Sequence, residues 1–136
     1  MQFSLGHQAI PEALADSARK FQTAESDVRD LLRPALKGVE KSQWEKVHTH
    51  LLDILIEGNE VANRMEIYRE IGRISFGEAR KLSNKIEDHI EDVIIVKSIL
   101  EGRSCPNEHI KVLNRLQSES GELLTQLRNL RSKFLR

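Results

Sequence analysis

A chain of 136 residues with 31% charged and 39% apolar residues, but only 7 glycines and 3 prolines, has the composition of long amphipathic helices rather than of a β-sandwich. Lysine and arginine number 21 together, as do aspartate and glutamate, so no net charge attracts nucleic acid or an anionic membrane. Aromatic residues make up only 4%, which argues against a surface that stacks bases.

The length suits one domain spanning residues 1–136, of which 1–9 are expected to be a loosely ordered lead-in. The first residues lack the basic and apolar stretches of a signal peptide, and no apolar run approaches the roughly 18 residues that a membrane span requires. The single cysteine, Cys105, is typical of a reducing compartment. The sequence therefore predicts a cytoplasmic protein that does not enter a membrane.

The first two helices follow from apolar periodicity and from start signals. Pro11 suits a first helical position, and the apolar residues after it recur in steps of three and four, which predicts a helix over about 11–37. The capping box Ser42-Gln-Trp-Glu45 opens a second helix over 42–72. Gly58-Asn59 in its middle leaves two interpretations: a glycine tolerated where a neighbouring helix comes close, or a break into two helices.

The second half of the chain repeats this arrangement. A second capping box, Ser75-Phe-Gly-Glu78, predicts a third helix over 75–101, and a fourth is expected over 106–135. Because only a few residues connect successive helices, neighbours must be antiparallel. The predicted fold is an all-α, up-down-up-down four-helix bundle.

The third predicted helix is apolar on more than one side. Leu82, Ile86 and Val93 share one stripe, whereas Ile95 and Ile99 lie roughly opposite it. On the second helix, Leu52 and Ile56 likewise fall beside the main stripe. Apolar residues outside the inward stripe either broaden the core or are covered by another chain. We therefore predict that an interface formed by Ile95, Ile99, Leu52 and Ile56 mediates self-association or partner docking.

Metal and cofactor sites are not predicted. A dimetal site of the ferritin type needs Glu-x-x-His on two helices, and this chain has only Glu45-Lys-Val-His48. His89 falls near the buried side of the third helix, where a core histidine bonded to a neighbour or to water is the ordinary interpretation. Another functional hypothesis is a bundle that senses a ligand in a polar cavity. It would use the polar positions nearest the core: Ser17, His89 and Ser120.

One segment is similar to the motif of HEPN-type ribonucleases, small helical bundles in which an arginine precedes a histidine by four to six residues. Arg103-Ser-Cys-Pro-Asn-Glu-His109 has that spacing, although the family pattern places a polar Asn, Asp or His where Ser104 stands. This resemblance implies, as an alternative function, a ribonuclease that uses Arg103 and His109 across a dimer.

The C-terminal end is basic, with Arg128, Arg131, Lys133 and Arg136. Cations near a helix C-terminus are stabilising in themselves. The second interpretation is a patch that docks an acidic partner surface, such as the acidic face of another copy. Taken together, these patterns favour a non-enzymatic protein that acts through protein–protein interaction, as an adaptor, chaperone, immunity or antitoxin-like protein, or regulator.

Overall fold

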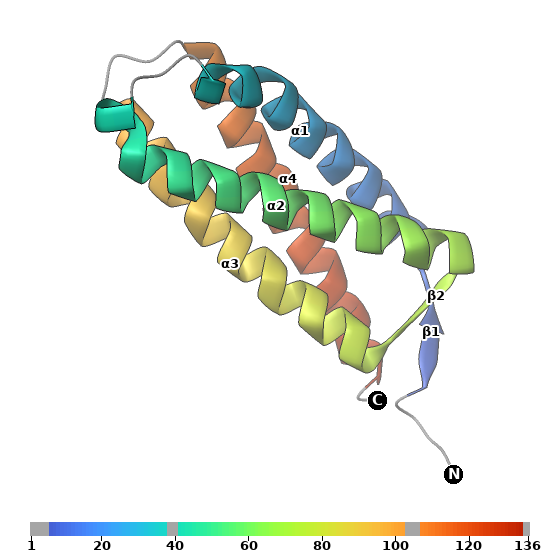
Figure 1. Cartoon of the computed structure of the whole chain (residues 1–136). Helices are drawn as coiled ribbons and strands as arrows, with labels where there is room; N and C mark the ends of the chain where they lie inside the picture. Colours follow the sequence, from blue (N-terminus) through green and yellow to red (C-terminus); the bar gives the residue numbers. More distant parts are fainter. Residues whose placement is uncertain (1–5, 38–40, 103–106, 135–136) are drawn as a thin grey trace.

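Four helices packed side by side make up the bulk of the molecule in the computed structural model (Figure 1). The structure describes residues 6–37, 41–102 and 107–134, apart from the side chains of 34–37 and 41–48. The helices are α1 (Glu12–Lys37), α2 (Lys41–Ile71), α3 (Phe76–Glu101) and α4 (Asn107–Phe134). Both α1 and α3 pack against α2 and against α4, which is the ring of neighbours expected of a bundle.

The predicted all-α four-helix bundle is therefore confirmed, and each helix ends within one residue of its predicted position. The start of α3 shows why. Ser75 has extended backbone angles and its hydroxyl accepts a hydrogen bond from the Glu78 backbone N–H, while the Glu78 carboxylate accepts one from the Ser75 N–H. These two bonds satisfy donors that a helix start leaves without partners, so the capping box identified in the sequence determines where α3 begins.

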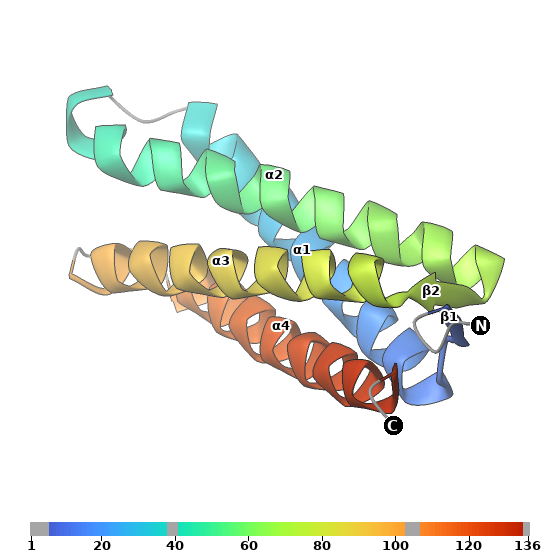
Figure 2. The same ribbon diagram turned by 90° about the horizontal axis from the view of Figure 1, so that it is seen from below.

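A short antiparallel ribbon closes one end of the bundle. Strand β1 (His7–Ala9) pairs with β2 (Arg73–Ser75), so that Gln8 lies opposite Ile74. Figures 1 and 2 place this ribbon at the end of the bundle where α4 finishes. Gly72, between α2 and β2, has a φ of +86°, which turns the chain at little steric cost.

The prediction of a loosely ordered lead-in over 1–9 is therefore wrong for His7–Ala9, while residues 1–5 lie outside the described part of the chain. The physical reason is that β2, which follows the turn after α2, exposes backbone N–H and C=O groups with which β1 can pair. The Ile10 N–H donates a 3.0 Å hydrogen bond to the Gly72 carbonyl and extends the ladder. Ile74 is fully buried, so the ribbon also covers the end of the core.

Gly58 decides between the two interpretations of α2, because the helix runs through it without a break. A Cβ built on Gly58 would lie 2.8 Å from Glu25 Cγ on α1 and 3.3 Å from His89 Cε1 on α3. Both distances are tighter than ordinary carbon contacts. The glycine is thus tolerated where neighbouring helices come close, as one of the two interpretations proposed.

Substituting Gly58→Ala is expected to lower the free energy of unfolding by about 1–3 kcal/mol, because the added methyl group must displace two buried side chains. Gly121→Ala is the matched control, since Gly121 lies inside α4 with open space around its Cβ position. That variant should be more stable than the wild type by about 0.5–1 kcal/mol. Urea denaturation followed by circular dichroism measures both, and equal effects of the two substitutions would contradict the close approach at Gly58.

Candidate functional site

A polar cluster interrupts the apolar core where α1, α2 and α3 meet at Gly58. The side chain of Glu25 is 1% exposed, and that of His89 is completely buried. Arg29, one turn after Glu25 on α1, donates hydrogen bonds to the Glu25 carboxylate from Nε, at 3.2 Å, and from a terminal guanidinium nitrogen. This pairing compensates the buried charge of Glu25, which would otherwise be strongly destabilising.

The imidazole of His89 is held by packing rather than by hydrogen bonds. It stacks on Phe21 with ring centroids 5.9 Å apart. Its Nδ1 lies 3.7 Å from Glu57 Oε1, too far for a good hydrogen bond, and neither ring nitrogen has a hydrogen-bond partner among the described residues. Buried nitrogens without partners cost on the order of 1–3 kcal/mol, so the surrounding apolar contacts must offset this cost.

Two carboxyl groups lie beside His89 on the α2–α3 side of the cluster. Burial raises the pKa of Asp92, and the adjacent Glu57 carboxylate raises it further, to about 6. Burial alone would also raise the pKa of Glu57, but contacts with His89 and Asp92 and the charge of Lys85 outweigh it, so this pKa lies below its usual range. Below about pH 6 the pair therefore holds its proton on Asp92 and its negative charge on Glu57.

Two further groups on α2 complete the electrostatic surroundings of Asp92. The charge of Asp53 raises the Asp92 pKa, whereas His50 lowers it. Like-charged carboxylates this close cannot both ionise freely, so the pair gains or loses one proton near pH 6. Within the described residues, no group of three or more His, Cys, Asp or Glu side chains is arranged to hold a metal ion.

The three polar positions expected near the core, Ser17, His89 and Ser120, are all buried. The hydroxyl oxygens of both serines have no hydrogen-bond partner among the described residues. None of the three residues lines any of three surface hollows described beside α2. The ligand-sensing hypothesis stays a prediction.

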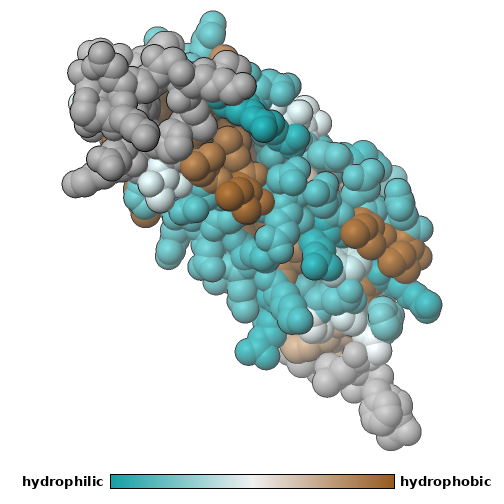
Figure 3. All heavy atoms as spheres, viewed as in Figure 1, coloured by the Kyte–Doolittle hydropathy of each residue, from teal (hydrophilic) through white to brown (hydrophobic). Residues whose placement is uncertain are grey.

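Among the described side chains of α2, four exposed aliphatic ones lie on its outer face. Their exposed fractions are 40% for Leu52, 63% for Ile56, 47% for Ile67 and 59% for Ile71. Figure 3, which views the molecule from the side of α2, shows apolar surface over the first half of α2 and again at its end, with polar surface between. The helix thus carries two apolar patches on its outer face in addition to its buried stripe, and no described residue of this chain buries them.

The interface residues predicted on α3 behave differently from one another. Ile95 is exposed, as is its neighbour Ile94, whereas Ile99 is half-buried and packs against the core. Leu52 and Ile56, the predicted interface residues on α2, are both exposed. Their role in binding stays a prediction, and α2 rather than α3 presents the longer apolar face.

A groove of about 490 Å³ runs between α1 and α2 beside the first half of this face. Its aliphatic wall comes from Leu52, Leu55 and Ile56, and α1 contributes Arg29 and Arg33. Arg29 is engaged by Glu25, while Arg33 is exposed and forms no ion pair with a described residue. The groove therefore combines an apolar wall with one cation that is available to a partner.

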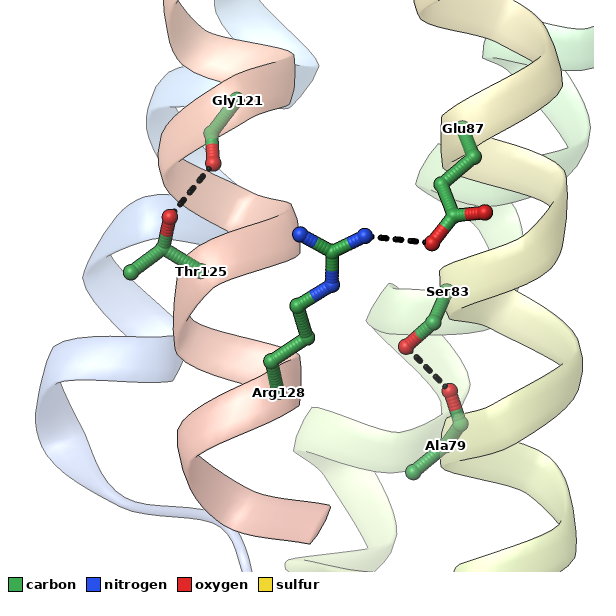
Figure 4. A network of polar contacts seen from close by, with 6 residues as sticks. All are labelled: Ala79, Ser83, Glu87, Gly121, Thr125 and Arg128. Atoms are coloured by element: carbon green, nitrogen blue, oxygen red, sulfur yellow. Dashed lines mark hydrogen bonds and ion pairs between the residues drawn. The ribbon is translucent and has the colours of Figure 1, made fainter. Parts of the chain in front are cut away.

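Two of the basic residues near the C-terminus contact other side chains of the bundle. Arg128 donates a 2.5 Å hydrogen bond to Glu87 across α3 and α4, as Figure 4 shows. The Arg131 guanidinium lies 5.8 Å from the centre of the Phe76 ring. Lys133 is exposed, and Arg136 lies outside the described residues. Two of the four predicted patch residues thus have partners within the chain, and the docking role of the patch stays untested.

The ribonuclease alternative also stays a prediction. His109 lies in the first turn of α4 and is half-buried, but Arg103 lies outside the described residues, so the distance between the two side chains is not defined. The chain was compared with models of protein families, with curated proteins and with solved structures, and none of the three comparisons gives a match. Within the described residues, no helix is both long enough and apolar enough to cross a membrane.

Asp92→Asn is expected to change stability in a pH-dependent way. Because folding raises the pKa of Asp92 from 3.8 to about 6, its stabilising contribution is fully present below about pH 4 and is lost as the pH rises through 6. Asparagine mimics the protonated acid at every pH. The variant should therefore exceed the wild type by about 1 kcal/mol at pH 7 and match it near pH 4.

Thermal unfolding at a series of pH values from 4 to 7 measures this difference. Asp88→Asn, an exposed change one turn earlier on α3, is the control and should stay within about 0.5 kcal/mol of the wild type. An Asp92→Asn variant whose advantage is the same at both ends of the pH range would contradict the shared proton.

Proposed function

We propose that this chain is a non-enzymatic helical-bundle protein of the cytoplasm that acts by binding another protein chain through the outer face of α2. The observation that carries the proposal is the row of exposed aliphatic side chains on that face, Leu52, Ile56, Ile67 and Ile71. Covering each of them would contribute on the order of 1 kcal/mol, because each is about half exposed. An adaptor, a chaperone, an immunity or antitoxin-like protein and a regulator all act through such a surface.

The groove beside this face supports the same proposal. A partner that covers Ile56 also reaches Leu55 and the exposed guanidinium of Arg33, so an apolar contact and a charged contact are available side by side. Apolar anchors surrounded by polar and charged groups are the usual anatomy of a protein interface. Of the buried polar cluster, only Arg29 lines this groove, while Glu57 and Asp92 lie between α2 and α3.

The proposal is tested by placing a photo-crosslinking amino acid at position 56 or, as the control, at position 94 in the full chain. Both positions are exposed aliphatic sites on long helices. Illumination in cells that make the protein should give a covalent protein adduct from position 56 and little from position 94, as resolved by mass spectrometry. If position 56 gives no protein adduct, or no more than position 94, the outer face of α2 is not a binding surface.

A further inference from the structure

The four aliphatic residues that are exposed among the described side chains of α2 are spaced symmetrically along the helix. Leu52 and Ile56 are four residues apart, as are Ile67 and Ile71, and the pattern reads the same from either end about a midpoint between Val61 and Ala62. At about 100° per residue, all four fall within roughly 100° of the helix circumference. The outer face therefore has two equivalent apolar patches, the Leu52–Ile56 patch and the Ile67–Ile71 patch, whose outermost residues lie about 28 Å apart.

A two-fold axis at this midpoint would bring the two patches into contact. In an antiparallel pair of α2 helices centred there, Leu52 of one copy faces Ile71 of the other, and Ile56 faces Ile67. The same contact between the two patches is then made twice, once on each side of the axis, as an isologous interface requires. Between the patches, Asn59 of one copy would lie beside Asn63 of the other near the axis, where the amide groups can hydrogen-bond and fix the register.

The charges on the α1 side of α2 are complementary in this same arrangement. Arg33 lines the groove beside Leu52 and Ile56, at one end of the face. Glu66 and Glu70 line a second hollow on the α1 side at the other end. All three side chains are exposed, and none forms an ion pair with a described residue. The two-fold axis places the glutamates of one copy beside the arginine of the other, so the unpaired charges attract.

We infer that the partner of the outer face of α2 is a second copy of this chain, packed antiparallel through α2 about a two-fold axis near residues 61 and 62. This inference rests on the proposed function and names its partner. The dimer buries the Leu52–Ile56 patch of each copy against the Ile67–Ile71 patch of the other. Arg33 pairs with Glu66 or Glu70 of the second copy at both ends.

Light scattering coupled to size-exclusion chromatography tests the dimer on the full chain. The wild type should have twice the 15.6 kDa mass of the chain at high concentration and should dissociate on dilution. Ile56→Glu should weaken the dimer about tenfold or more, because it buries a carboxylate in the apolar contact. Ile94→Glu, the control on α3, should leave it unchanged. A wild type that stays monomeric, or a dimer weakened equally by both substitutions, overturns the inference.

Disulfide trapping tests the register and does not depend on a destabilising variant. In a Cys105→Ser background, the double variant Ile56→Cys, Ile67→Cys should oxidise to a covalent dimer, because positions 56 and 67 face each other across the axis. Each single-cysteine variant should stay largely monomeric, since equivalent positions lie about 16 Å apart along the helix. Efficient trapping by either single variant, or none by the double variant, contradicts the antiparallel register.

These outcomes separate the inference from the proposed function. A monomeric chain that still crosslinks from position 56 to a different protein refutes the second copy but leaves α2 as a binding surface. A chain with neither a dimer nor a crosslink at position 56 refutes both.

Discussion

The close approach of three helices at Gly58 is the constraint around which the bundle is arranged. A glycine there leaves the space that Glu25 of α1 and His89 of α3 occupy, and both side chains are consequently excluded from water. Burying an ionised carboxylate is tolerable only with a partner, and Arg29 supplies it from one turn away on the same helix. The close spacing of the helices, the burial of Glu25 and its ion pair with Arg29 thus all depend on the absence of a side chain at Gly58.

That constraint also accounts for the unusual titration on α2 and α3. Because α2 lies close to α3 at this level, Glu57 and Asp92 are held near each other, and partial burial weakens the screening of their charges by water. One proton shared by the two carboxyl groups relieves the repulsion. Polar groups such as Glu57 therefore interrupt the apolar side of α2 that faces α3.

The elements could be predicted from the sequence much better than the sites. The capping box at Ser75 and the three-and-four spacing of apolar residues are local signals, so they placed the helices correctly. The capping box proposed at Ser42 stays a prediction, because the side chains of 41–48 lie outside the described part of the chain and α2 already begins at Lys41. Glu25 was missed as a core residue, since a charge beside an apolar stripe is ordinarily solvated and its burial depends on a glycine more than 30 residues later. The strand pairing of His7–Ala9 was missed for the same reason, because its partner edge is formed only in the folded chain.

Helix α2 has polar groups on its inner side and exposed aliphatic residues on its outer face. Among the described elements this helix packs chiefly against α1 and α3, and polar groups share its inner side with the apolar stripe. Other aliphatic residues of α2 lie outward, where Ile56 and Ile71 are each more than half exposed. A helix that is apolar on both sides is stabilised when both are covered, and the bundle covers only one. The symmetric spacing of the outward residues makes a second α2, running the other way, a surface complementary to the first.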